Sequence, residues 1–416
     1  MKNPFLLSST GSGRATAYIE SPKVITYQGK THVAWLDTPA EGFRVKVRTL
    51  DRATGEWSET VTVGEAIDNH GGPALTIDGE GYLHIVYFSH HHPFRYHRSV
   101  RPNDTSEWGL REQFGVDLTY PTLLCGHDGT LILSARRSHN EKPWELEIWR
   151  KPPGGAWTRG ETILRSDRIN YSQYAASMIW GPDHRTLYLG YRLYQQPAYD
   201  SPPVSSTAVG CMMSPDEGAT WTKIDGTPLA LPATESTSDV IMRSQSSEGR
   251  VLESGAIALS PEGVPFVAYS VRMEHSAEGY LATPKKGGGW HHLYLNQFLP
   301  AEHRNGALIM SGGLTFKGNG QPVMVAPLLN LKDGGEYWGH PSTKLVQFDS
   351  EDGGKSFVSK LVGGGEADQP QWMPSLERPT GFNEVPEVPS MIYTDGGRGS
   401  GCDDVLKNKV FYDLLT

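Results

Sequence analysis

The chain has 416 residues, a net charge of −9 and 20% charged residues, and its 47 glycines and 29 prolines make up about 18% of the total, against a usual share of about 12%. Its apolar content suffices for a sizeable core, which excludes a disordered chain. An acidic balance without any long run of Lys and Arg argues against nucleic acid or an anionic membrane as a partner.

Cysteine usage and apolar runs narrow the class further. Three widely spaced cysteines exclude a disulfide framework and any Cys-x-x-Cys metal motif. No stretch approaches 18 apolar residues, so no membrane span is expected. The apolar run near Met1 is too short for a signal peptide. The location is therefore left as either cytoplasmic or, if a leader has been removed, secreted or periplasmic.

Along the chain, a hairpin pattern returns about every fifty residues. Each copy is an apolar strand, a turn with Gly or Pro-Asp, and a second strand. The turn glycines of the first three copies, Gly29, Gly79 and Gly129, stand 50 residues apart, and each follows a polar residue, which is typical of hairpins. Six copies can be placed: Pro22–Asp37, Pro73–Phe88, Pro121–Ala135, Ala175–Tyr191, Ala256–Val271 and Leu314–Ala326. A seventh, irregular unit follows from about residue 369.

Tryptophans and Asp-box turns fall between the hairpins, where a third and a fourth strand of each unit would lie. Ser214–Trp221 and Ser350–Phe357 both fit the S-x-D-x-G-x-[ST]-[WF] pattern of the Asp-box. The tryptophans are Trp57, Trp108, Trp157, Trp221 and Trp290. Four strands repeated about seven times favour an all-β fold, a single seven-bladed β-propeller over residues 1–416. A pair of β-sandwiches is the alternative, and the constant spacing argues against it. Residues 195–252, with Ser-Pro-Pro and Ser/Thr clusters, are expected to form an insert over one face.

The open ends of the hairpins carry a set of polar and aromatic residues. His70 and His90 are equally far from the second turn, and Tyr120 and Arg136 are equally far from the third, so each pair is expected to be cross-strand neighbours at one rim. Arg136 and Arg137 alternate across a strand, so one must point away. The fourth and fifth hairpins would add Tyr171, Tyr174, Arg192, Tyr194 and Arg272.

The composition of this rim points to a particular chemistry. It holds no obvious pair of carboxylates, which an ordinary glycosidase requires. A His–Tyr–Arg set instead suits β-elimination from a uronic acid. Arginine can neutralise the substrate carboxylate and stabilise the enolate-like intermediate. Histidine can accept a proton at neutral pH, and tyrosine can protonate the departing oxygen or, with a lowered pKa, act as the base.

Three segments, Asn69–Asp78, Gly81–His84 and His90–Tyr96, resemble the ulvan lyases with a seven-bladed propeller, part of a wider group of propeller enzymes that act on rhamnose–uronic acid linkages. The resemblance implies that His70 is the catalytic His and His90 a second active-site His. It implies that Tyr120 and Arg136 are the catalytic Tyr and the neutralising Arg. It further implies substrate contacts for Tyr171 or Tyr174 and for Arg192. Some relatives carry a structural metal, but Cys211 is followed by two methionines, which are poor Zn²⁺ partners, so neither metal nor cofactor is predicted.

The leading hypothesis is a polysaccharide lyase that cleaves a glucuronate or iduronate–rhamnose glycan such as ulvan by β-elimination. His70, Tyr120 and Arg136 would be catalytic, with the acid and base roles of His70 and Tyr120 left open. The expected partner is an anionic polysaccharide or oligosaccharide, and a monomer is expected. One alternative is an α-L-rhamnosidase or a sialidase-like hydrolase on the same scaffold, suggested by the Asp-boxes, although the arginine triad, Tyr–Glu pair and early Arg-Ile-Pro motif of sialidases are not found. The other is a non-catalytic, glycan-binding propeller.

Overall fold

The structure is a computed structural model that describes residues 4–416 except 19, 89, 168, 170, 197–205, 246–247, 333 and 365–368. The fold is all-β, which confirms the predicted class. In the described part of the chain, helices are limited to short 3₁₀ turns such as η2 (Asn296–Phe298) and η3 (Ala301–His303). Among the described residues, no helix has the length and apolar character needed to cross a membrane.

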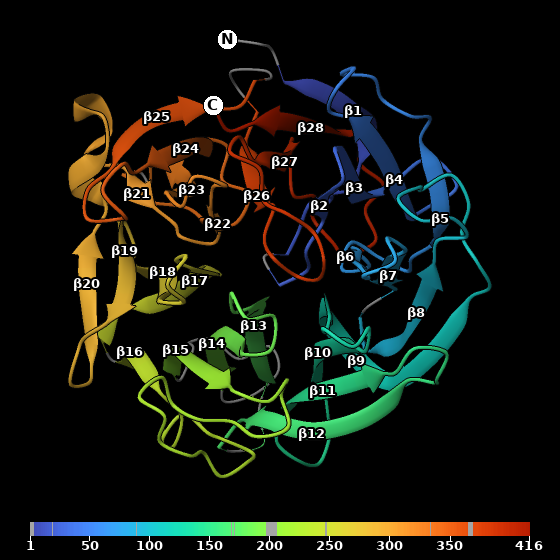
Figure 1. Ribbon diagram of the computed structural model, residues 1–416. Coiled ribbons are helices and arrows are strands. Elements are labelled where there is room, and N and C mark those ends of the chain that lie inside the picture. The colour runs from blue at the N-terminus through green and yellow to red at the C-terminus, as the bar shows by residue number, and fades with distance from the viewer. Residues whose placement is uncertain are drawn as a thin grey trace.

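The strands form antiparallel sheets that are arranged around a common centre (Figure 1). The first sheet joins the two ends of the chain: β26 (Gln371–Leu376), β27 (Ser390–Asp395), β28 (Asn408–Leu414), β1 (Phe5–Gly11), β2 (Val24–Tyr27), β3 (Lys30–Asp37), β4 (Arg44–Asp51) and β5 (Val61–Glu65). The second contains β6 (Ala74–Ile77), β7 (Leu83–Tyr87), β8 (His92–Arg98), β9 (Glu112–Cys125), β10 (Leu131–Arg137), β11 (Glu145–Lys151) and β12 (Thr158–Arg165).

Three further sheets follow in chain order. The third contains β13 (Tyr171–Trp180), β14 (Leu187–Gln196), β15 (Ser206–Ser214) and β16 (Val240–Gln245). The fourth contains β17 (Val251–Leu259), β18 (Pro265–Arg272), β19 (Ala277–Pro284) and β20 (Trp290–Tyr294). The fifth contains β21 (Ala307–Leu308), β22 (Gly313–Phe316), β23 (Pro322–Leu329), β24 (Lys344–Asp349) and β25 (Val358–Val362).

All six predicted hairpin turns are confirmed. The first is the tightest, because Tyr27 pairs with Lys30 across the two residues Gln28 and Gly29. Both of these have positive φ, at 44° and 76°. That is the backbone of a type I′ turn, whose twist matches the twist of the two strands that it joins. Local turn chemistry therefore sets the register of this hairpin.

Both Asp-box turns are also confirmed, each held by hydrogen bonds within the motif. In the first, the Ser214 hydroxyl accepts from the Gly218 amide at 2.6 Å, and Asp216 accepts from the Thr220 amide at 2.7 Å. The second turn repeats these bonds, with Ser350 accepting from Gly354 at 2.8 Å. The motif thus satisfies its own backbone amides at the surface.

The prediction of an insert at residues 195–252 needs correction. Strands β15 and β16 lie inside this segment and complete the sheet that starts with β13 and β14. Part of the segment, 197–205 and 246–247, lies outside the described residues. The Ser- and Thr-rich composition was misleading because β15 contains no Ser or Thr from Ala208 to Met213, and Ala208, Val209, Cys211 and Met212 are all buried.

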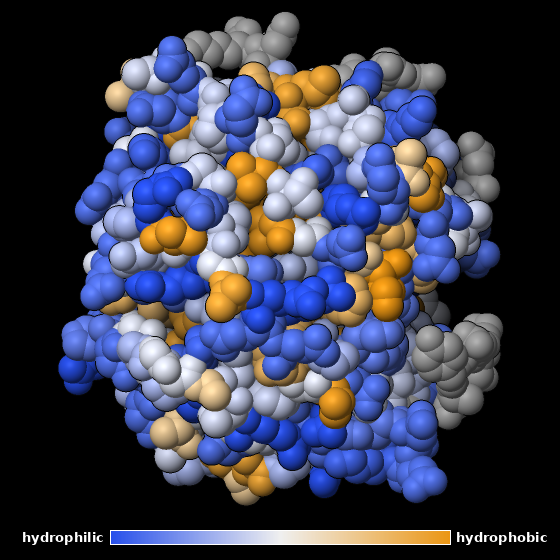
Figure 2. Space-filling model, turned by 90° about the vertical axis from the view of Figure 1, so that its right-hand side faces the viewer, coloured by the Kyte–Doolittle hydropathy of each residue, from blue (hydrophilic) through white to orange (hydrophobic). Residues whose placement is uncertain are grey.

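Much of the core lies between neighbouring sheets, as where the fully buried Trp221 packs with residues of the second and third sheets, whereas the fully buried Trp35 packs within the first sheet. The outer side in Figure 2 is mostly hydrophilic, with hydrophobic residues in small scattered groups. At the centre of the ring, by contrast, residues of several sheets meet around a pocket.

Candidate active site

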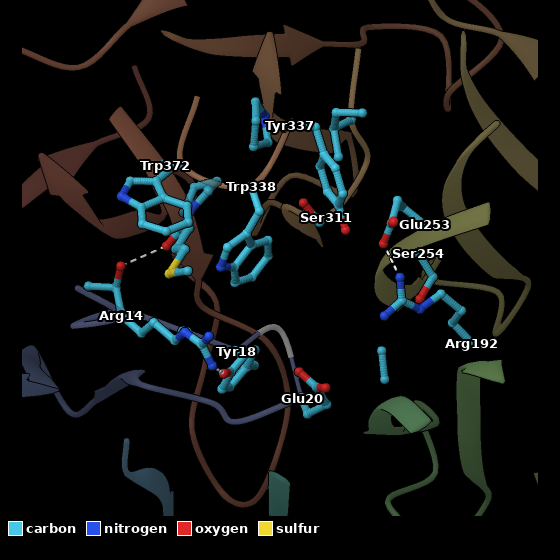
Figure 3. Close-up of a pocket in the computed structure, with 18 of the residues that line it drawn as sticks. Arg14, Tyr18, Glu20, Arg192, Glu253, Ser254, Ser311, Tyr337, Trp338 and Trp372 are labelled. Atoms are coloured by element: carbon cyan, nitrogen blue, oxygen red, sulfur yellow. Dashed lines mark hydrogen bonds and ion pairs between the residues drawn. The ribbon is translucent and has the colours of Figure 1, made fainter. Parts of the chain in front are cut away.

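The central pocket has a volume of about 230 Å³. The segment after β1 contributes Arg14, Tyr18 and Glu20 to its lining, and the sheets contribute His70 and Tyr120 among others. In Figure 3, Arg14 and Tyr18 lie on one side, Arg192, Glu253 and Ser254 lie on the other, and Glu20, Ser311 and Trp338 lie between them. Two of the predicted catalytic residues therefore line one cavity.

A single carboxylate holds the two predicted histidines. Asp68, which is 3% exposed, accepts from Nδ1 of His70 at 3.2 Å through Oδ1, and its Oδ2 contacts Nδ1 of His90. The two imidazole rings stack with centroids 3.8 Å apart, which confirms that they are neighbours. Because Asp68 takes the Nδ1 hydrogens, each Nε2 is left with its lone pair. The arrangement fixes the tautomer that can accept a proton.

Arginine 14 meets the other side of His70. Its Nη1 donates to Nε2 of His70 at 2.6 Å and also contacts the Tyr18 hydroxyl. Burial lowers the pKa of His70 to about 3, and the positive charge of Arg14 acts in the same direction against the hydrogen bond to Asp68. His70 is therefore neutral near neutral pH.

Tyr120 and Arg136 are also brought together, as predicted. The Arg136 guanidinium carbon lies 4.6 Å from the Tyr120 ring centroid, and the β9–β10 register shifts by one residue next to this pair. At this shift Tyr120 has φ of 60°, which is rare for a residue with a side chain. Its hydroxyl accepts from Nε2 of Gln173 at 3.3 Å, and burial raises its pKa. Tyr120 is thus protonated at neutral pH.

Arg136 is buried without a counter-ion. Its side chain is 1% exposed, and its guanidinium lies 4.8 Å from the Trp144 ring and 5.9 Å from the Tyr171 ring. Its Nε and Nη1 have no hydrogen-bond partner, and no carboxylate among the described residues lies within ion-pairing distance. Arg137 points the other way and pairs with Glu147 at 3.2 Å, as strand alternation requires.

Of the other residues predicted to contact the substrate, some line the pocket and one does not. Tyr171 lines the pocket. Arg192 lines it as well, but its guanidinium contacts Glu253 and Gln173, so it is not a free cation. The structure does not place Tyr174 in the pocket: it is fully buried, and its hydroxyl donates to the Trp144 carbonyl at 2.6 Å. Tyr171 and Tyr174 are three residues apart on one strand and therefore face opposite sides.

A family model described as "BNR repeat-containing family member" matches residues 30–297. The chain belongs to the BNR repeat-containing family. The Asp-box turns at Ser214–Trp221 and Ser350–Phe357 agree with this assignment.

Relatives of this BNR-repeat chain include ulvan lyases, which confirms the resemblance seen in the sequence. An ulvan lyase of Nonlabens ulvanivorans is 25% identical over 201 residues, which are 42% of this chain and 41% of that protein. The "Ulvan Lyase-PL25" of Pseudoalteromonas sp. (strain PLSV) is 25% identical over 162 residues, 33% of this chain and 32% of that protein. The aligned part thus spans about two fifths of the first of these curated relatives.

Solved structures extend the likeness over nearly the whole fold. A PL25 ulvan lyase structure matches with a TM-score of 0.73 and 18% identity, covering 99% of this chain and 95% of that one. A structure of the same kind, described as bound to -[GlcA(1-4)Rha3S]-, matches with a TM-score of 0.72, 18% identity and the same coverage. At this identity the likeness establishes a shared fold.

Several residues of the BNR-repeat site were not predicted. Asp68 stands two residues before His70, and this spacing was the available signal for it. Arg14, Tyr18 and Glu20 come from an irregular segment, and Trp338 comes from the β23–β24 connection; neither has a repeat pattern that places it at the centre. Only the tertiary structure shows that Arg14, Tyr18, Glu20 and Trp338 line the pocket.

Two groups among the described residues have ligand atoms close enough to hold a metal ion, with all such atoms within 4.8 Å of one another. One is Asp68, His70 and His90; the other is His139, Glu145 and Glu147. In the second group, Arg137 and Arg159 already neutralise Glu147, at 3.2 and 2.8 Å. In the first group a cation would compete with the hydrogen bonds to Asp68 and would lie near the Arg14 guanidinium, whose Nη1 is 2.6 Å from Nε2 of His70.

Proposed function

We propose that this protein is a polysaccharide lyase that cleaves a uronic acid–rhamnose glycan by β-elimination. The observation that carries the proposal is the buried Arg136, which has no counter-ion among the described residues and lies against the ring of Tyr120. An unpaired buried cation is costly for a folded protein. A substrate carboxylate would remove that cost and would be bound bidentately.

The groups around Arg136 support elimination because their protonation states suit it. Arg136 would neutralise the uronate carboxylate, which acidifies the proton on C5 and stabilises the enolate-like intermediate. Neutral His70 would take the C5 proton at Nε2, and the electron pair would form the C4=C5 double bond as the C4–O4 bond breaks. Protonated Tyr120 would give its phenolic proton to the departing O4. Transfer of the proton from His70 to Tyr120 would then restore the enzyme.

Arg14 has a defined part in this scheme. It occupies Nε2 of His70 in the structure, at 2.6 Å, so the base is not free until Arg14 is drawn away. A bound anionic sugar would compete for the Arg14 guanidinium, and His70 would then be exposed to C5. The stacked His90 and the ring of Tyr171 would line the remainder of the site, with Arg192 held by Glu253.

The relatives support the substrate class. The glycan named with the similar solved structure combines glucuronate with sulfated rhamnose. We propose that this chain acts on the same kind of uronate–rhamnose linkage and cleaves the bond at C4 of the uronate. The partner is then an anionic polysaccharide or oligosaccharide, and we propose that the protein acts on it as a monomer.

We also propose that residues 1–416 form a single seven-bladed propeller. Two of the sheets would each be two blades joined at their edges. In one, β1 meets β3 at a single pair, Gly11 and Asp37. In the other, the long strand β9 pairs with β8 through its first half and with β10 through its second half. Separation at these two places would give seven units of about four strands.

The test is incubation with ulvan while the ultraviolet absorbance of the new double bond is recorded. With a lyase, the absorbance rises steadily as unsaturated product accumulates. The variant Tyr120→Phe, which leaves the aromatic ring in place, should reduce the rate of this rise. Release of reducing sugar without absorbance would contradict elimination and favour the hydrolase, for which Glu20 and Glu253 are the two carboxylates in the pocket. Glycan binding without any product would favour the non-catalytic alternative.

A further inference from the structure

Two residues that the hairpin spacing places at the rim, Tyr194 and Arg272, have no part in the proposed mechanism. Both line a second pocket of about 520 Å³, the outer pocket, which adjoins the catalytic pocket. The two pockets share four lining residues, which are Tyr171, Gln173, Arg192 and Tyr337. In the part of the chain that the structure describes, the two pockets are therefore one continuous cleft, and a glycan bound at the histidines can extend into the outer pocket.

Arg272, the last residue of β18, brings to the outer pocket a cation that can still donate hydrogen bonds. Its Nε is buried without a hydrogen-bond partner among the described residues, while its side chain is 24% exposed. Oε1 of Glu253 is 3.7 Å from this Nε, which is an ion pair but too long for a hydrogen bond. The guanidinium carbon lies 4.1 Å from the Tyr337 ring centroid. This contact orients the guanidinium without replacing the hydrogen bonds that an anion would accept.

The charges around the outer pocket favour an anionic ligand. Arg192 and Arg272 both contact a single carboxylate, that of Glu253, and Figure 3 shows the contact with Arg192. The other acidic residue of the lining, Glu336, pairs with Arg398 at 2.5 Å. Two guanidinium groups thus share one carboxylate. Because the chain as a whole has a net charge of −9, a local excess of this kind is what can hold an anion.

Glu20, the remaining acidic residue of the continuous cleft, does not reverse this balance. It lines the catalytic pocket and not the outer one. Burial raises its pKa to about 7, and the positive charges of Arg192, Lys23 and Arg378 act on it in the opposite direction. Its negative charge is therefore partly protonated near neutral pH and is faced by cations of its own.

Aromatic rings complete the outer pocket. The ring centroid of Tyr194 lies 5.5 Å from the Arg192 guanidinium carbon. The Tyr171 ring is nearly perpendicular to that of Tyr194, with centroids 6.4 Å apart and an interplanar angle of 87°. Rings of this kind offer an apolar body to the C–H groups of a sugar and a polar hydroxyl to its oxygens. Together with the arginines, they suit a sugar that carries a negative charge.

We propose that the outer pocket is a subsite for a second, anionic sugar unit of the glycan, and that Arg272 binds the sulfate or carboxylate group of that unit. This inference rests on the proposed function and adds a residue that recognises the unit beside the reacting uronate. Both groups present several oxygens to the donor fork of a guanidinium, which is the chemistry they share. Because Arg272 is not among the groups that act on the reacting uronate, it should strengthen substrate binding without changing the chemical step.

The first experiment measures Arg272→Gln with ulvan as the substrate. KM should rise about 10–100-fold, as expected for lost hydrogen bonds to a charged group, with kcat within a few-fold of the wild type. Arg272→Lys, which keeps the charge but not the fork, should give an intermediate KM. Arg101→Gln is the matched control and should behave as the wild type, because Arg101 also pairs with carboxylates, at 2.8 and 3.1 Å, but lies outside both pockets.

A wild-type KM in Arg272→Gln would overturn the subsite. If the glutamine variant does not fold, the lysine variant decides in the same way.

The second experiment uses desulfated ulvan to distinguish the two anionic groups. If Arg272 binds a sulfate, desulfation should raise the KM of the wild type to that of Arg272→Gln and leave the variant unaffected. If it binds a carboxylate, the variant should lose the same factor on both polymers. Equal KM values for the wild type and the variant on both polymers would contradict either form of the proposal.

The third experiment separates the subsite from the lyase activity. Ulvan oligosaccharides are titrated by calorimetry into Tyr120→Phe and into the double variant that also carries Arg272→Gln, and weaker binding by the double variant is expected. If the wild type forms no unsaturated product but the double variant still binds more weakly, the proposed function fails and the subsite stands. Equal binding by the two proteins refutes the subsite whatever the activity.

Discussion

Replacement of Arg136 by methionine should lower kcat strongly while changing the free energy of unfolding little. Methionine fills much of the same space but carries no charge and cannot donate hydrogen bonds. In the proposed mechanism, Arg136 makes two charge-assisted hydrogen bonds to the uronate as negative charge develops, each contributing about 1.5–3 kcal/mol. At about 1.4 kcal/mol for each tenfold change in rate, their loss lowers kcat by roughly 10²–10⁴-fold.

The stability of the variant should change much less, since two effects oppose each other. The three aromatic rings around the guanidinium, with centroids at 4.6, 4.8 and 5.9 Å, stabilise it by about 0.5–2 kcal/mol each. Burial of a charge without a counter-ion costs several kcal/mol in the other direction. Because these contributions are of similar size, we expect the free energy of unfolding to change by less than about 2 kcal/mol.

The assay is the ultraviolet rate on ulvan at saturating substrate, together with denaturant unfolding of the same samples. Arg137→Met is the matched control, since Arg137 is the next residue on β10 but faces away and pairs with Glu147. Its rate should remain within a few-fold of the wild type. If Arg136→Met also keeps its kcat within a few-fold, the carboxylate-neutralising role is wrong.

Three further predictions follow from the same site and its surroundings. Tyr120→Phe should lower kcat by about 10²–10⁴-fold with little change in glycan affinity by calorimetry, because only the acid is removed, and an unchanged rate would exclude Tyr120 as the acid. Asp68→Asn should lower kcat by about 10–100-fold, because the tautomers of His70 and His90 are no longer fixed; a wild-type rate would argue against that role. Burial raises the pKa of Glu377 to about 7. The folded state therefore keeps a proton that the unfolded state releases, and stability falls by about 3 kcal/mol as pH rises from about 4.5 to 7. Denaturant unfolding of Glu377→Gln should lack this loss, and an identical pH dependence in both proteins would contradict it.

The parts of the fold that could be predicted are those set by local sequence. The turn at Gln28 and Gly29 needs positive φ at both positions, and such residues between apolar runs can be recognised directly. The stacking of His70 on His90 follows from their equal distance from one turn. Where composition was used without register, as in residues 195–252, it concealed the strands β15 and β16.

The parts that could not be predicted depend on where distant segments meet. Glu20 lies in an irregular segment, and its neighbours Ser254 and Trp338 come from other sheets, so no spacing within the chain connects them. Tyr174 shows the opposite failure. The sequence placed it near the rim, but the twofold alternation of the strand turns it into the core, away from Tyr171.

The masses of the products test the central claim most directly. A defined uronate–rhamnose oligosaccharide is digested, and both fragments are weighed. Elimination adds nothing, so the two masses should sum to that of the substrate, with the unsaturated uronate on one fragment. A sum that exceeds the substrate by one water would show hydrolysis and would contradict the lyase mechanism built on His70, Tyr120 and Arg136.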